Sequence, residues 1–182
     1  MERILQLIES FSYIKLKGNF MKSKVTMAKH PLHPMLVGFP IAFYTAAMLA
    51  FVAYAVNGDS FWFRLAYTSN IAGVVMAFFA AVPGIIDWLL AIPKHNPAKR
   101  TAFTHMLLNS IALICFSLNW WLQSGKWNDE QPNATGSIFL TVLGLGFTFA
   151  SGFLGWSLVQ KHHIGIDEKE NVPEDFIKKK AG

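Results

Sequence analysis

Six histidines are the side chains of this sequence best suited to chemistry, and three of them occupy similar places. His33 begins the first long apolar segment, His105 stands about one turn inside the third, and His162 closes the fourth. Imidazole is the commonest protein ligand for metal ions and for haem iron. The three histidines therefore predict a cofactor site for either b-type haem or a transition-metal ion, whereas each histidine alone would only cap or line a helix end.

Two further polar residues stand where apolar ones are expected. Asp87 lies near the end of the second apolar segment, where an ionised carboxylate needs a partner or a wet cavity; an interfacial carboxylate paired with Lys94 is the alternative. Asn109 lies four residues after His105 and so on the same helix face, where it either orients a ligand or joins two helices. The predicted ligands are thus His33, His105, His162 and Asp87, with Asn109 as a supporting group.

The elements that must position these groups are membrane-spanning helices. Of the 182 residues 53% are hydrophobic and 15% charged, with a mean hydropathy of +0.34, against about 25% charged in an ordinary soluble domain. Since a bilayer core needs about 20 residues of helix, spans are predicted at about residues 36–56, 65–92, 101–123 and 134–160. Short links make neighbouring spans antiparallel. The predicted fold is all-α, an integral membrane four-helix up-down bundle rather than a soluble enzyme.

The basic residues predict the orientation of the bundle. All sixteen lysines and arginines except Arg64 and Lys126 fall before the first span, between the second and third, or after the fourth. The positive-inside rule then predicts that both termini of this multi-pass membrane protein lie in the cytoplasm (N-in/C-in). A net charge of +5 that is confined to such flanks reflects topology and argues against nucleic-acid binding.

Composition also limits how a cofactor could be held. With Cys115 as its single cysteine, the chain excludes an intramolecular disulfide, a cysteine-ligated iron–sulfur cluster and covalently attached c-type haem. Small residues mark one face of the second and fourth spans: Gly73, Ala77, Ala80, Gly84, Gly144, Thr148, Gly152 and Gly155. Such faces indicate close helix packing, or room for a flat porphyrin or quinone ring. No internal repeat is apparent.

Four motifs follow one another along the chain: His30-Pro31-Leu32-His33-Pro34, Gly84-Ile85-Ile86-Asp87-Trp88, His105 with Asn109, and His162 before Ile164-Gly165-Ile166-Asp167. In order and spacing they resemble a bacterial four-helix membrane family of unknown function that is sometimes fused to Rieske iron–sulfur domains. The resemblance implies a location in the bacterial inner (plasma) membrane. The resemblance covers about residues 29–167, which leaves 1–28 as an N-terminal cytoplasmic extension and 168–182 as a cytoplasmic tail. Members often have glycine after the histidine that matches His162, whereas this chain has His163, so either imidazole could be the ligand.

Two functions remain open from the sequence. In the first, a histidine-ligated haem or metal ion near the cytoplasmic face serves membrane redox chemistry or electron transfer, and the Rieske fusions imply a respiratory or Rieske-type redox partner. In the second, the chain is a cofactor-free scaffold or accessory subunit of a membrane complex, whose histidines cap and pack helices. Neither function decides whether the chain is an enzyme. The lipid bilayer is the expected partner, and both functions are compatible with a homo-oligomer.

Overall fold

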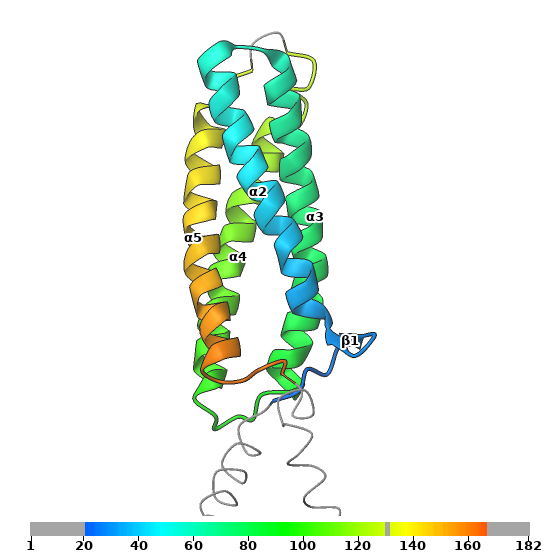
Figure 1. Ribbon diagram of the computed structural model, residues 1–182. Helices are drawn as coiled ribbons and strands as arrows, with labels where there is room; N and C mark the ends of the chain where they lie inside the picture. The colour runs from blue at the N-terminus through cyan, green and yellow to red at the C-terminus, as the bar shows by residue number, and fades with distance from the viewer. Residues whose placement is uncertain (1–20, 130–131, 167–182) are drawn as a thin grey trace, which may run out of the picture.

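The computed structural model describes residues 21–129 and 132–166, and four long helices make up most of them (Figure 1). They are α2 (Leu32–Asn57), α3 (Ser60–Leu90), α4 (Ala98–Gln123) and α5 (Thr135–Gln160). Each is long and apolar enough to cross a membrane. The predicted all-α fold with four spanning helices is therefore confirmed.

The N-terminal edge of the bundle differs from the prediction by a small hairpin. Strand β1 (Thr26–Met27) pairs antiparallel with β2 (His30–Pro31) directly before α2. Ala28 and Lys29 make the turn with positive φ angles of 50° and 70°. Strands of two residues carry no alternating pattern, so the sequence could not indicate them. Residues 1–20 of the predicted N-terminal extension (1–28) and the whole predicted tail (168–182) lie outside the described residues.

The bundle consists of two helix pairs. Helix α2 packs mainly against α3 and α4 mainly against α5, with fewer contacts between the pairs, as Figure 1 shows. Short links hold each pair antiparallel, and between α2 and α3 the link is only Gly58 and Asp59. Gly58 has a φ of +72° and ends α2, while the Asp59 side chain accepts a hydrogen bond from the Phe61 amide and begins α3. We call the end at which α2 begins and α5 ends the proximal end, and the opposite one the distal end.

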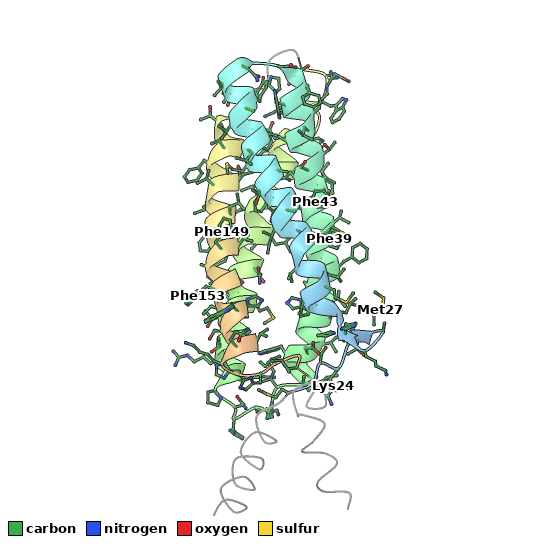
Figure 2. The ribbon with its side chains drawn as sticks, viewed as in Figure 1. Lys24, Met27, Phe39, Phe43, Phe149 and Phe153 are labelled. Carbon is green, nitrogen blue, oxygen red and sulfur yellow. The ribbon has the colours of Figure 1, made fainter. Side chains whose placement is uncertain are left out.

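The outside of the bundle is apolar, and several of its most buried residues are polar. Phe149 and Phe153 are 62% and 67% exposed, and Figure 2 shows them on the outer face of α5. Asn70 and Thr141, in contrast, are completely buried. A soluble protein rarely exposes so many large apolar side chains, whereas a bilayer solvates them and leaves polar groups to pair inside. The distribution is that of a membrane protein.

The two helix pairs are related by an approximate two-fold repeat. His33 and His105 are separated in sequence by the same number of residues as Tyr44 and Phe116, and these pairs occupy equivalent positions. Gly73 and Gly144 are equivalent at a separation one residue shorter. The shorter separation also matches buried positions of α3 with buried positions of α5: Ala66 with Ser137, Asn70 with Thr141, Val74 with Leu145, and Ala80 with Ser151. Helix α2 thus corresponds to α4 and α3 to α5. Few matched residues are identical, which explains why the sequence showed no repeat.

Two aromatic rings mark the centre of this arrangement. Tyr44 and Phe116 stack in parallel with ring centroids 3.5 Å apart, so the two equivalent residues meet each other. Each ring also fills the space above a glycine of its own helix pair. A Cβ atom on Gly73 would lie 2.5 Å from the Tyr44 ring, and one on Gly144 would lie 2.6 Å from the Phe116 ring. The small residues at these positions therefore serve ring packing.

Replacing Gly144 with alanine should destabilise the bundle by about 1–3 kcal/mol, because the new methyl group overlaps the Phe116 ring. Gly146 on the same helix is the matched control, since a Cβ there meets no atom within 4 Å. Gly146→Ala should be neutral or stabilise by up to about 1 kcal/mol, which is the helix-propensity gain. Thermal unfolding of both variants in lipid nanodiscs checks the difference, and equal effects at the two positions would contradict the packing described here.

Candidate cofactor site

His33 occupies the second position of α2, at the proximal end of the bundle, and packs against α3. Its Nδ1 lies 2.7 Å from the carbonyl oxygen of Ala80. A Cβ atom on Gly84, one turn further along α3, would lie 2.9 Å from the same nitrogen. Because a carbonyl can only accept a hydrogen bond, Nδ1 carries the proton and Nε2 has the free lone pair.

His105 repeats this arrangement in the second helix pair. Its Nδ1 lies 2.8 Å from the Ser151 carbonyl oxygen and 2.9 Å from Ser151 Oγ, and this hydroxyl in turn donates to the His105 carbonyl. Gly155 lies one turn beyond Ser151, where a Cβ would approach the ring to 3.1 Å. The matching residues of the first pair are Ala80 and Gly84. Both imidazoles are thus held in one tautomer by a carbonyl of the neighbouring helix.

The two rings meet across the interface between the helix pairs. Their centroids are 6.1 Å apart and their planes are perpendicular. Asn109 lies one turn further into the bundle, and its Nδ2 donates to Nε2 of His105 over 3.1 Å. The structure therefore brings together three of the predicted site residues: His33, His105 and Asn109. We refer to the two histidines as the imidazole pair.

Asp87 serves a different contact. Its carboxylate accepts hydrogen bonds from Ser23 Oγ and from the Lys24 amide, both over 2.6 Å, and the residue is 9% exposed. The partners come from the segment before α2, whose tip Figure 2 shows projecting beside the bundle at Met27. Neither partner was predicted: the sequence offered Lys94, which follows α3, whereas Ser23 and Lys24 precede α2. Asp87 thus anchors the chain that leads into α2.

His162 lies in the turn that follows α5. The adjacent chain closes the proximal end, since Met21 pairs with Ile164 through hydrogen bonds from the Met21 amide to the His163 carbonyl and from the Gly165 amide to the Met21 carbonyl. Within residues 21–129 and 132–166, no group of three or more histidine, cysteine, aspartate or glutamate side chains is arranged to hold a metal ion. Neither His162 nor Asp87 therefore forms such a group with the imidazole pair.

Asp87→Asn should loosen the segment before α2. The amide oxygen can still accept one hydrogen bond, but the amide NH2 group then faces the other of the two donors that bind the carboxylate, and two donors do not bond to each other. Hydrogen bonds to a charged group contribute about 1.5–3 kcal/mol each, so we expect a loss of about 1–3 kcal/mol in unfolding free energy. Faster hydrogen exchange of the Lys24 amide would accompany it. Asp129→Asn, at an exposed loop position, is the control. An unchanged exchange rate at Lys24 would show that the carboxylate is not the anchor.

Some residues that shape the site were missed by sequence reasoning. Ser151 supplies both acceptors to His105, and it lies on the same face of α5 as Thr148 and Gly155, so helical spacing could have indicated it. The Ala80 carbonyl was not predictable, because any residue type offers a carbonyl. Gly84 and Gly155 were recognised as parts of small-residue faces, and the structure adds that each lies directly against an imidazole.

Four apolar helices around buried polar groups define the class of this chain as an integral membrane protein of the four-helix type. A model of the DUF2231 family, described as predicted membrane proteins, matches residues 29–168, and the chain belongs to this family. This match confirms the resemblance that the sequence motifs indicated, to a four-helix membrane family of unknown function. No curated protein and no solved structure matches the chain.

Proposed function

We propose that this membrane protein binds b-type haem between His33 and His105 and carries single electrons within the membrane. The observation that supports the proposal most strongly is the equivalence of the two imidazoles. Each comes from one helix pair, and each directs Nδ1 to a backbone carbonyl of the neighbouring helix. This second hydrogen bond is the one that metal-ligating histidines usually make, and it leaves Nε2 for the metal.

The spacing of the pair fits two ligands of one metal. Metal–imidazole bonds are about 2 Å long and the ring centre lies about 1 Å behind the ligating nitrogen, so two opposed imidazoles would have centroids about 6 Å apart. The observed distance is 6.1 Å. Asn109 would give up its hydrogen bond to His105 Nε2 when a ligand binds, and it would then be available to contact that ligand.

The number of ligands favours haem over a bare ion. A transition-metal ion commonly takes four or more ligands, and two imidazoles supply only part of such a set. In the described part of the chain, no third histidine, cysteine or carboxylate joins them in a metal-binding arrangement. A porphyrin brings four nitrogens of its own and requires only axial ligands from the protein. When bound, haem would supply reversible one-electron oxidation and reduction, while the chain would hold and orient it.

An absorption spectrum of protein purified from its native membrane, oxidised and reduced, tests the proposal together with elemental analysis. We expect a Soret band that shifts on reduction and about one iron per chain. Stoichiometric metal without that band would instead indicate an ion at the imidazole pair. Absence of both would overturn the proposal and leave the cofactor-free scaffold, in which the two histidines only join helices.

The setting of this function is proposed from the charge pattern and the family. Both termini would face the cytoplasm of a bacterial inner membrane, which puts the imidazole pair near the cytoplasmic face. A respiratory or Rieske-type protein is the proposed redox partner, and a homo-oligomer is compatible with the apolar outer face.

Reporter fusions test the orientation. A fusion after Trp127, in the link between α4 and α5, should behave as periplasmic, and one after Lys94 should behave as cytoplasmic, because the basic residues lie around the second position. The opposite pattern would place the imidazole pair at the outer face.

A further inference from the structure

The distal half of the bundle contains a second group of buried polar side chains, far from the imidazole pair. Asn119 and Gln123 lie one turn apart on α4 and are 1% and 3% exposed. Asn70 of α3 and Ser137 of α5 contact them and are fully buried. We refer to these four residues as the distal amide cluster.

Hydrogen bonds to backbone carbonyls fix which way each amide of the distal amide cluster points. Asn70 donates through Nδ2 to the Phe116 carbonyl over 3.0 Å, so its Oδ1 is left to accept from Asn119 Nδ2, also over 3.0 Å. Gln123 donates through Nε2 to the Asn133 carbonyl over 3.3 Å and to Ser137 Oγ. A carbonyl cannot donate, so neither chain of bonds can be reversed.

This orientation leaves two acceptors without a donor. Asn119 Oδ1 and Gln123 Oε1 are fully buried and have no hydrogen-bond partner in the described part of the chain. A buried acceptor without a partner destabilises the folded state, because it has lost its hydrogen bonds to water. Two such atoms on neighbouring turns of one helix therefore both need a hydrogen-bond donor.

The approximate two-fold repeat shows that helix packing does not require polar residues here. The positions equivalent to Asn119, Gln123 and Ser137 are Ala47, Phe51 and Ala66. All three are apolar and completely buried. The same packing task is thus performed by apolar side chains in the other half of the molecule, so packing alone does not account for the two unpartnered amide oxygens.

We infer that the distal amide cluster binds water, with a molecule that donates one hydrogen to Asn119 Oδ1 and the other to Gln123 Oε1. Side chains four residues apart on a helix have Cβ atoms about 5–6 Å apart, a span that one water can bridge. Buried waters typically make about three hydrogen bonds to polar groups that otherwise lack partners. Gln123 is the last residue of α4 and bonds to the distal link at Asn133, so the site lies at the distal end of the bundle. This inference does not depend on haem binding.

Water-edited solid-state NMR of the full-length protein in lipid tests the site. We expect polarisation transfer from water to the side-chain amides of Asn119 and Gln123 at least several-fold faster than to Ala47 and Phe51, their buried equivalents. Equal, slow transfer at all four positions would overturn the inference. In Gln123→Met, which removes the acceptor at similar volume, transfer to Asn119 should fall while the fold persists.

Thermal unfolding in sodium, potassium, ammonium and choline chloride separates water from a cation at the same oxygens. If the distal amide cluster binds water, the Tm should be the same in all four salts at equal ionic strength. A saturable rise in Tm with one cation, absent in Gln123→Met, would overturn the assignment to water in favour of a cation.

Discussion

Replacing either His33 or His105 with alanine is expected to abolish haem binding, with the two variants equally affected. Each helix pair contributes one imidazole to the imidazole pair, and each imidazole is held by an equivalent hydrogen bond to a backbone carbonyl. The Soret absorbance per purified chain measures the effect. His162→Ala should retain the haem, because His162 does not join the pair in a metal-binding arrangement.

Two controls separate loss of a ligand from loss of the fold. His95→Ala alters an exposed histidine of the loop between α3 and α4 and should leave the spectrum unchanged. His105→Gln can still donate to the Ser151 carbonyl but offers no imidazole nitrogen, so it should fold without haem. Haem retained by both alanine variants at the parental level would exclude the imidazole pair as its ligands.

Valine at Gly84 or Gly155 should disturb the same site from the neighbouring helices. A Cβ at these positions already approaches His33 to 2.9 Å and His105 to 3.1 Å, and the larger side chain must displace the rings. We expect a loss of about 1–3 kcal/mol in stability and a 10- to 100-fold loss in haem affinity, on the order of the effects seen when groups that support metal ligands are removed. Haem titration of the apoprotein measures the second effect.

Gly152 provides the matched control for these substitutions. It lies on α5 between Ser151 and Gly155, but a Cβ there meets no atom within 4 Å. Gly152→Val should therefore bind haem like the parent. If it lost haem as strongly as Gly155→Val, the effect would stem from helix composition and not from contact with the imidazole.

The sequence was sufficient to predict the fold because each spanning helix coincides with a long run of apolar residues. In lipid such a run is stable as a helix independently of tertiary contacts. It also indicated His33, His105 and Asn109, since polar groups in such runs are conspicuous. The partner of Asp87 could not be found in this way, because Ser23 and Lys24 belong to an irregular segment whose path depends on the assembled bundle. The two-fold repeat was hidden for another reason, since it preserves burial and side-chain size more than residue identity.

Electron paramagnetic resonance of the oxidised protein, purified from its native membrane, tests the role of the imidazole pair most directly. The planes of the two rings are perpendicular, so a ferric haem between them should give a highly anisotropic low-spin signal, distinct from the rhombic signal of parallel imidazoles. His33→Ala and His105→Ala should each remove it. A high-spin signal in the parent protein, or no haem signal at all, would contradict ligation by His33 and His105.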